Sequence, residues 1–148
     1  MFITNKLELR LQTKTDKIFK GIINASDQFD VSICNPPFFA TAEDAKKAHL
    51  RKLSRLKKKK ITSKKLNFGG KSNELWFEGG EKRFVELMIK ESMAYKNQVH
   101  WFTTLISKEE HLAKAKKNLE KANATKKQII SMELGNKKSR ILAWSFKN

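Results

Sequence analysis

Apolar and polar positions along the chain predict short strands that alternate with amphipathic helices. Leu7, Leu9 and Leu11 alternate with polar residues, as the residues of a strand do. Residues 18–23 place their apolar side chains on one face of a helix. Residues 30–34 form a short apolar strand that ends at two prolines, because proline lacks the N–H that a sheet ladder needs.

The same alternation continues after residue 80. A helix is predicted to begin near Glu81, because an acidic side chain is favourable at a helix N-terminus. Residues 99–106 are rich in β-branched and aromatic side chains and predict a buried strand. Ser107 and Glu110 have the spacing of a capping box, which predicts the start of the next helix.

Two strands at residues 128–132 and 141–146, with a turn around Gly135 and Asn136 between them, predict a closing hairpin. The order of elements predicts an open α/β sheet with right-handed crossovers and an antiparallel hairpin on one edge. Aromatic residues within these patterns, such as Phe102 and Trp144, are expected in the core rather than as stacking platforms for RNA.

Composition adds a strong electrostatic bias. The 148 residues, 39% of them hydrophobic, are enough for one domain with a core. Thirty-two Lys and Arg against fifteen Asp and Glu give a formal net charge of +17, which indicates a polyanionic partner. The single cysteine, Cys34, and three scattered histidines predict no internal disulfide and no metal site. With no membrane-length apolar run and no secretory signal, we expect a soluble, cytoplasmic protein.

The positive charge is concentrated between residues 46 and 65, where eleven basic residues occur without one acid. Part of this run has helical spacing, but the block of four consecutive lysines repels itself, so we predict a mobile basic loop at about residues 40–70. Its cations are expected to contact RNA phosphates. The predicted RNA-binding residues are Arg51, Arg55, Lys57, Lys58, Lys59 and Lys60.

The most specific chemical feature is the tetrapeptide Asn35-Pro36-Pro37-Phe38 at the end of an apolar strand, where ligands bind in open α/β sheets. The Asn35 side chain and the Pro36 carbonyl offer two acceptors, and Phe38 offers a flat face for stacking. This set suits a planar amine such as the exocyclic NH₂ of a nucleobase. The alternative is that Asn-Pro-Pro merely ends the strand and Phe38 fills the core.

Residues 35–38 resemble motif IV of the class I S-adenosylmethionine-dependent amino-methyltransferases. Four later segments narrow the resemblance to the bacterial 23S ribosomal RNA adenine-N6 methyltransferases, the large subunit methyltransferase F family, and to the related U6 small nuclear RNA enzymes. The segments are Leu-Asn-Phe-Gly-Gly at 66–70, Glu-Leu-Trp at 74–76, Glu-Gly-Gly-Glu at 78–81 and Leu-Ala-Trp-Ser-Phe at 142–146. The resemblance covers nearly the whole chain.

The resemblance implies methylation of an adenine N6 amine in 23S ribosomal RNA, with S-adenosylmethionine as the cofactor. It implies that Asn35 and the Pro36 carbonyl hold the amine, that Pro37 completes the motif and that Phe38 stacks on the flipped adenine. It also implies that Asn35, Lys14 and Thr15 border the cofactor. The Glu-Gly-Gly-Glu block is expected to shape the substrate loop, without a chemical step.

One departure from the family pattern is the absence of a glycine-rich loop after an N-terminal strand, which holds the cofactor in such folds. The resemblance therefore implies that residues 1–148 form one partial domain: the C-terminal half of a Rossmann-like methyltransferase sheet, from the third strand onward. Two other functions stay open. One alternative is a catalytically inactive RNA-binding fragment. The other is an amino-methyltransferase that acts on guanine in RNA or glutamine in protein.

Overall fold

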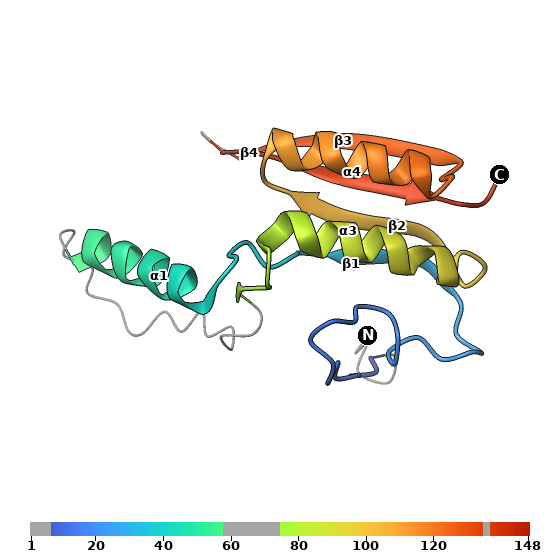
Figure 1. The fold of residues 1–148 in the computed structure, drawn as a ribbon, viewed down its shortest axis with the longest axis horizontal. Coiled ribbons are helices and arrows are strands. Elements are labelled where there is room, and N and C mark those ends of the chain that lie inside the picture. The colour runs from blue at the N-terminus through green and yellow to red at the C-terminus, as the bar shows by residue number, and fades with distance from the viewer. Residues whose placement is uncertain (1–6, 58–74, 135–136) are drawn as a thin grey trace, which may run out of the picture.

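The computed structural model describes residues 7–57, 75–134 and 137–148 and has one four-stranded sheet (Figure 1). The order of strands across the sheet is β1-β2-β4-β3. β1 runs parallel to β2, whereas β2 and β3 are both antiparallel to β4. The strands are β1 (Phe29–Cys34), β2 (Val99–Ile106), β3 (Lys126–Leu134) and β4 (Lys137–Ser145).

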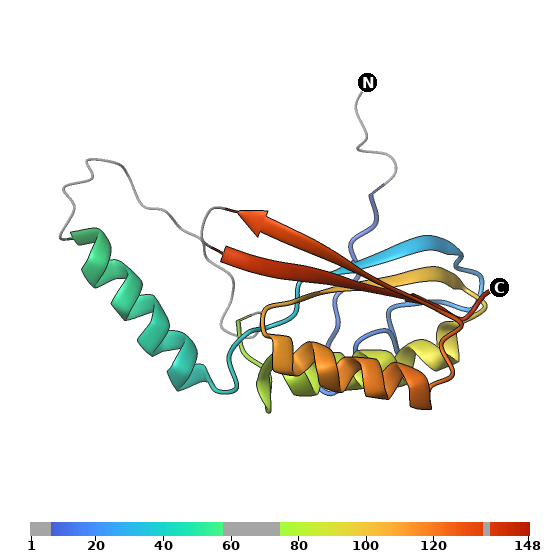
Figure 2. The same ribbon diagram turned by 90° about the horizontal axis from the view of Figure 1, so that it is seen from above.

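Two helices cover one face of this sheet and a third extends away from it (Figures 1 and 2). α3 (Gly80–Ser92) and α4 (Glu109–Lys121) lie against the sheet, and the short 3-10 helix η2 (Met93–Tyr95) follows α3. α1 (Ala42–Lys57) projects from the end at which β1 stops. The layer of α3 and α4 on a mixed sheet confirms the predicted α/β class and the predicted antiparallel hairpin.

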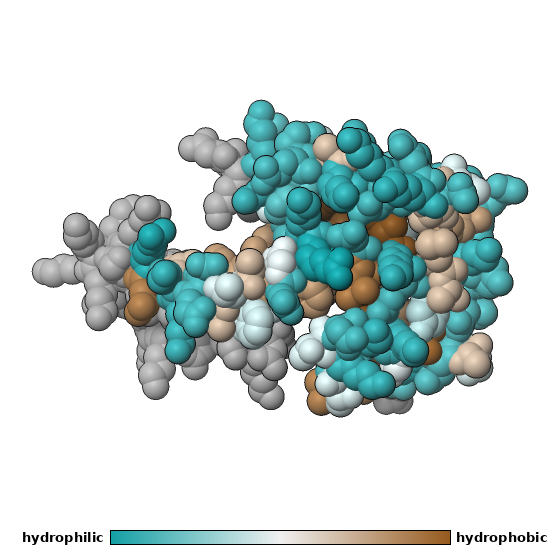
Figure 3. Space-filling view, in the orientation of Figure 1, coloured by the Kyte–Doolittle hydropathy of each residue, from teal (hydrophilic) through white to brown (hydrophobic). Residues whose placement is uncertain are grey.

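The core lies between the sheet and the two covering helices. Phe102 of β2 and Trp144 of β4 are completely buried, and their rings stack with centroids 5.7 Å apart. The Trp144 indole N–H donates to the hydroxyl oxygen of Ser92, 3.0 Å away at the end of α3, so its only polar atom is satisfied. On the surface, α4 is mainly hydrophilic, and an apolar strip follows the junction of α3 and α4 (Figure 3).

The predicted strand at Leu7, Leu9 and Leu11 and the predicted helix at residues 18–23 are both wrong, because this segment is a series of turns and extended backbone. Its apolar spacing is overridden by tertiary hydrogen bonds. One carboxylate oxygen of Glu91 on α3 accepts the backbone N–H groups of Ile18, Phe19 and Lys20 at 2.8–3.3 Å. Within this range Gly21 adopts a positive φ of 88°, a left-handed conformation that interrupts a right-handed helix.

The Arg10 side chain further ties the N-terminal segment together. Its guanidinium donates to Glu8, to the Ile22 carbonyl and to Asp27. The hydrogen bond from Arg10 lowers the pKa of Asp27, so this carboxylate remains charged and available to the Asn24 N–H, 2.7 Å away. The described sheet therefore begins at β1, and the predicted strand before it is not part of the sheet.

β2 has its predicted bounds, whereas β3 and β4 begin two and four residues earlier than predicted, and two further predictions need correction. Ser107 does not form a capping box with Glu110; α4 has Lys108 at its N-cap and no side-chain cap. The basic loop predicted at residues 40–70 is wrong for its first part, because α1 extends to Lys57. Its first turn is stabilised by Thr41, whose hydroxyl oxygen accepts the N–H of Asp44 at 3.1 Å. The rest of that loop, and the turn at Gly135 and Asn136, lie outside the described residues.

Candidate active site

The tetrapeptide Asn35–Phe38 leaves the sheet at the carboxyl end of β1. Cys34, the last residue of β1, is in register with Thr104 near the end of β2, so both parallel strands end at the same edge. Pro36 and Pro37 are buried, whereas Asn35 is exposed and Phe38 keeps 48% of its surface exposed. The buried prolines thus anchor the segment, and Asn35 and Phe38, the two side chains that could bind a ligand, are exposed.

The backbone after Phe38 is held by a second segment far along the chain. Phe39 forms an isolated parallel bridge with Trp76. The Phe39 N–H donates to the Leu75 carbonyl at 3.2 Å, and the Phe77 N–H donates to the Phe39 carbonyl at 2.9 Å. The path from Asn35 to Phe39 is therefore anchored at both ends, by β1 and by this bridge.

Two glycines make the turn that leads from the bridge into α3. Gly79 and Gly80 have positive φ angles of 82° and 66°, a conformation that glycine adopts without steric cost. A Cβ atom on Gly79 would lie 2.7 Å from Cβ of Arg83, and the Gly80 N–H donates to the Phe77 carbonyl at 2.7 Å. The Glu-Gly-Gly-Glu block thus has a geometric reason for its glycines.

Glu81, the last residue of that block, is buried, with 2% of its surface exposed. Its carboxylate accepts the Ser107 N–H at 3.0 and 3.1 Å and the Ser107 hydroxyl at 2.5 Å. Nδ1 of His111 on α4 lies 2.8 Å from Oε1. An acid at a helix N-terminus was the only signal in the sequence, and it predicts a solvated side chain rather than this cluster.

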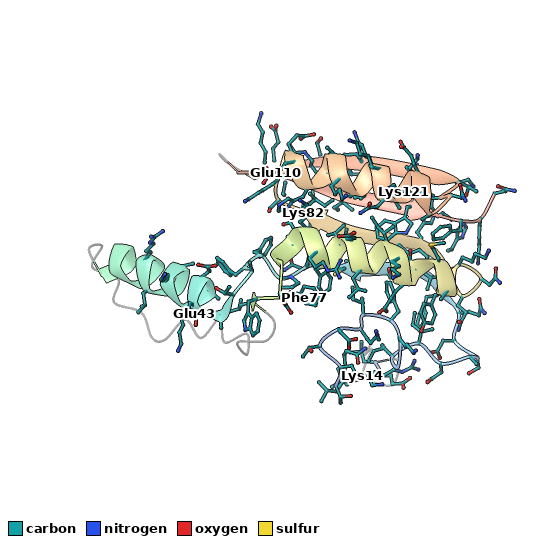
Figure 4. The ribbon with its side chains drawn as sticks, in the orientation of Figure 1. Lys14, Glu43, Phe77, Lys82, Glu110 and Lys121 are labelled. Atoms are coloured by element: carbon teal, nitrogen blue, oxygen red, sulfur yellow. The ribbon has the colours of Figure 1, made fainter. Side chains whose placement is uncertain are left out.

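The predicted cofactor residues Lys14 and Thr15 are exposed on a turn of the N-terminal segment. The turn continues into Asp16 and Lys17, which line an open hollow of about 490 Å³. The opposite wall of this hollow belongs to the segment 77–79 and to α3. Figure 4 shows Lys14 on the N-terminal segment and Phe77 just before α3. Among the described residues, Lys14 and Thr15 form no hydrogen bond with residues 35–38.

The predicted RNA-binding cations lie on or just after α1. Arg51 is exposed on this helix, and Arg55 and Lys57 belong to its last turns. Lys58, Lys59 and Lys60 lie outside the described residues. α1 follows the Phe39 bridge directly, and its backbone extends outward from the edge that carries Asn35.

Neither a metal cluster nor a membrane span is found within residues 7–57, 75–134 and 137–148. No group of three or more His, Cys, Asp or Glu side chains is placed to hold a metal ion there. No helix in these ranges combines the length and apolar character needed to cross a membrane.

The mixed sheet with its antiparallel hairpin has the fold of a methyltransferase domain. A solved structure of the hMettl16 catalytic domain in complex with MAT2A 3′UTR hairpin 1 is similar with a TM-score of 0.62 and 26% sequence identity, over 84% of this chain and 42% of that one. The N-terminal domain of human METTL16 in complex with SAH has the same fold, with a TM-score of 0.57 and 23% identity, over 88% of this chain and 38% of that one.

The chain belongs to the RNA methyltransferase family, whose model matches residues 2–148. It is 51% identical to the ribosomal RNA large subunit methyltransferase F of Bacteroides fragilis (strain YCH46) over 144 residues, which is 97% of this chain and 47% of that protein. The chain spans about half the length of the curated relatives it matches. The resemblance inferred from the motifs is thereby confirmed.

Cys34 provides a chemical probe beside Asn35. Burial raises the pKa of its thiol to about 11, against an opposing hydrogen bond with Thr104. The protonated thiol is the form that the fold prefers, so this contribution to stability is full below about pH 9 and lost as the pH rises through 11.

We expect iodoacetamide to alkylate Cys34 about 100-fold more slowly in the folded chain than in the urea-unfolded chain at pH 8, because a rise in the thiol pKa from 9.0 to about 11 reduces the thiolate fraction about 100-fold. Cys34 is the only cysteine, so mass spectrometry of the whole chain measures the rate directly. A folded-state rate that levels off near pH 9 would contradict the burial of this thiol.

Proposed function

We propose that this chain forms the substrate-holding side of an S-adenosylmethionine-dependent methyltransferase that modifies the N6 amine of an adenine in 23S ribosomal RNA. The proposal depends mainly on one observation: in a member of the RNA methyltransferase family, Asn35 and Phe38 are exposed at the carboxyl edge while Pro36 and Pro37 are buried. The name of the relatives, ribosomal RNA large subunit methyltransferase F, supports the choice of substrate. Such a substrate would place the protein in the cytoplasm.

Asn35 would act on the geometry of the target amine. The lone pair of an adenine N6 atom is delocalised into the ring, which makes the nitrogen a poor nucleophile. If the Asn35 side-chain oxygen and the Pro36 carbonyl accept its two N–H bonds, they draw the nitrogen towards tetrahedral geometry and free the lone pair. The excess proton then leaves to solvent once the nitrogen has become cationic.

Phe38 would hold the base that carries this amine. An adenine must leave its stack to reach a protein site, and an aromatic ring compensates for the stacking that the base gives up. The exposed ring of Phe38, which follows the end of β1 closely, is available for that contact. Pro37 keeps the backbone between the amine-binding group and the stacking ring stiff.

The polar groups at this edge fit one side of a cofactor site. Within the described part of the chain the Asn35 amide forms no hydrogen bond, and the Thr15 hydroxyl and Lys14 ammonium are exposed. S-adenosylmethionine would supply an electrophilic methyl group there, and the human METTL16 domain solved with SAH supports this cofactor. Asn35, Lys14 and Thr15 would hold its polar parts, and a glycine-rich loop for the rest is not among the described residues.

The first prediction of this proposal concerns Asn35. In an active polypeptide that contains this chain, for example joined to the N-terminal half of a relative, Asn35→Ala should reduce kcat by about 10²–10³ with little change in RNA affinity. Methyl transfer to a 23S ribosomal RNA fragment measures this, and nucleoside analysis identifies the product. Phe38→Ala should instead weaken RNA capture by about 1–3 kcal/mol.

Asn97→Ala is the matched control, because this exposed asparagine precedes β2 at the opposite end of the β1–β2 pair. It should leave both kcat and RNA affinity unchanged. If Asn35→Ala lowered only the melting temperature, the tetrapeptide would be a strand terminator. Methylated guanine or glutamine in place of N6-methyladenosine would assign a different substrate, and no product at all would favour an RNA-binding fragment.

The second prediction distinguishes direct phosphate contacts from a general effect of net charge on RNA affinity. Changing Lys57–Lys60 to glutamine should weaken RNA binding, and the slope of log K against log salt should fall by about 0.7 for each phosphate of single-stranded RNA that is no longer neutralised. The control changes four lysines of α4, Lys114, Lys116, Lys117 and Lys121, and so removes the same charge elsewhere. Equal effects in the two variants would show that only the net charge matters.

The third prediction concerns the cofactor. Isothermal titration of this chain alone with S-adenosylmethionine should show no saturable binding at micromolar concentrations, because its described residues offer only one side of the site and affinity depends on preorganised contacts. Fusion to the N-terminal half of a relative should restore binding. Micromolar binding by the chain alone would show that its own residues complete the cofactor site.

A further inference from the structure

The buried carboxylate of Glu81 joins three separate elements. Glu81 belongs to the first turn of α3, Ser107 follows the last residue of β2, and His111 lies in the first turns of α4. A buried carboxylate requires hydrogen-bond partners: Ser107 supplies two donors, and Nδ1 of His111 lies 2.8 Å from Oε1. The start of α3 is therefore fixed relative to the carboxyl ends of the strands.

The opposite side of the same helix start contacts the segment that leaves β1. A Cβ atom on Gly80 would lie 3.5 Å from the Ala40 nitrogen, so the two backbones pack closely there. The Gly80 N–H holds the Phe77 carbonyl, and the Phe77 N–H in turn holds the Phe39 carbonyl. A short, continuous series of hydrogen bonds thus connects the start of α3, where Glu81 lies, to the residue after Phe38.

We propose that Glu81 is a positioning residue that fixes the Asn35–Phe39 segment through the start of α3. For its effect on catalysis, this inference rests on the proposed function, in which Asn35 and Phe38 hold the target adenine. Glu81 touches neither of these residues, and it acts by restricting how far the bridge at Phe39 moves from the end of β2. Both carboxylate oxygens are essential, because a neutral amide has one oxygen to accept the donors that the carboxylate shares between two.

Amide hydrogen exchange of the full 148-residue chain, followed by NMR, tests the mechanical part. In Glu81→Gln, exchange at the Phe39 and Phe77 amides should be faster by about tenfold or more, relative to the Leu142 amide in the centre of β4, which reports global unfolding. Ser92→Ala is the matched control, because it removes the buried acceptor of Trp144 at the other end of α3. It should not raise the ratio of Phe39 or Phe77 exchange to Leu142 exchange.

A milder variant keeps the test decisive if Glu81→Gln does not fold. Ser107→Ala removes only the hydroxyl donor and leaves the Ser107 N–H bound to the carboxylate, so the same two amides should exchange faster by a smaller factor. The inference is overturned if neither variant changes the exchange of Phe39 and Phe77 relative to Leu142.

Activity separates this inference from the proposed function. In an active polypeptide containing this chain, Glu81→Gln should lower kcat by about tenfold or more with a much smaller change in KM for RNA, whereas Ser92→Ala should leave kcat unchanged at permissive temperature. Faster exchange together with normal kcat would overturn the catalytic part of the inference. If Asn35→Ala had no effect on methyl transfer while the exchange result held, the proposed function would fail and the mechanical role of Glu81 would stand.

Discussion

Parallel pairing of β1 with β2 is the constraint on which the rest of this structure depends. Parallel strands cannot be joined by a tight turn, so the chain must return along one face of the sheet before β2 begins. α3 makes that return (Figure 2). As a result, the carboxyl ends of two strands and the N-terminal ends of α3 and α4 meet at one edge, and residues from distant parts of the sequence come together there.

The antiparallel hairpin extends the sheet on the other side of β2. β4 inserts between β2 and β3, and its Trp144 fills the space between Phe102 and the end of α3. The Leu-Ala-Trp-Ser-Phe segment therefore contributes to the core, as expected for an aromatic in a strand pattern, and not to RNA stacking. A core residue with its one polar atom satisfied leaves few alternative packings, so β2 and β4 keep a fixed position against α3.

The sequence was a good guide where local pattern and tertiary context agree. β2 was predicted with its observed bounds because β-branched and aromatic residues fill most of it, and the end of β1 followed from Pro36 and Pro37. Residues 18–23 misled because helical apolar spacing cannot reveal that Gly21 adopts a positive φ, or that Glu91, more than seventy positions later, holds the N–H groups of Ile18, Phe19 and Lys20. Ser107 misled for the same reason, because its N–H and hydroxyl donate to the distant Glu81 and do not form the capping box with Glu110.

The placement of Asn35 at the sheet edge was predictable, whereas the bridge from Phe39 to Trp76 and the Glu81 cluster were not. A motif that follows a strand has its position set by that strand. Contacts between segments far apart along the chain depend instead on how α3 packs, and no spacing in the sequence encodes that packing. The glycine pair at residues 79–80 was visible, but its positive φ angles acquire meaning only next to Ala40 and Arg83.

The distribution of charge suggests that different residues provide RNA affinity and the rate of the proposed methyl transfer. The atoms proposed to hold adenine are neutral: an amide, a proline carbonyl and a phenyl ring. The cations begin on α1, which leaves the same edge through Phe39–Thr41 and carries its acids in the first turn and its bases towards the end, as the helix dipole favours. Phosphate contacts on α1 would then supply affinity that salt weakens, while the neutral groups supply a rate that salt hardly affects. Because the Phe39 bridge lies between the two, a shift of that bridge would alter the rate without removing a single cation.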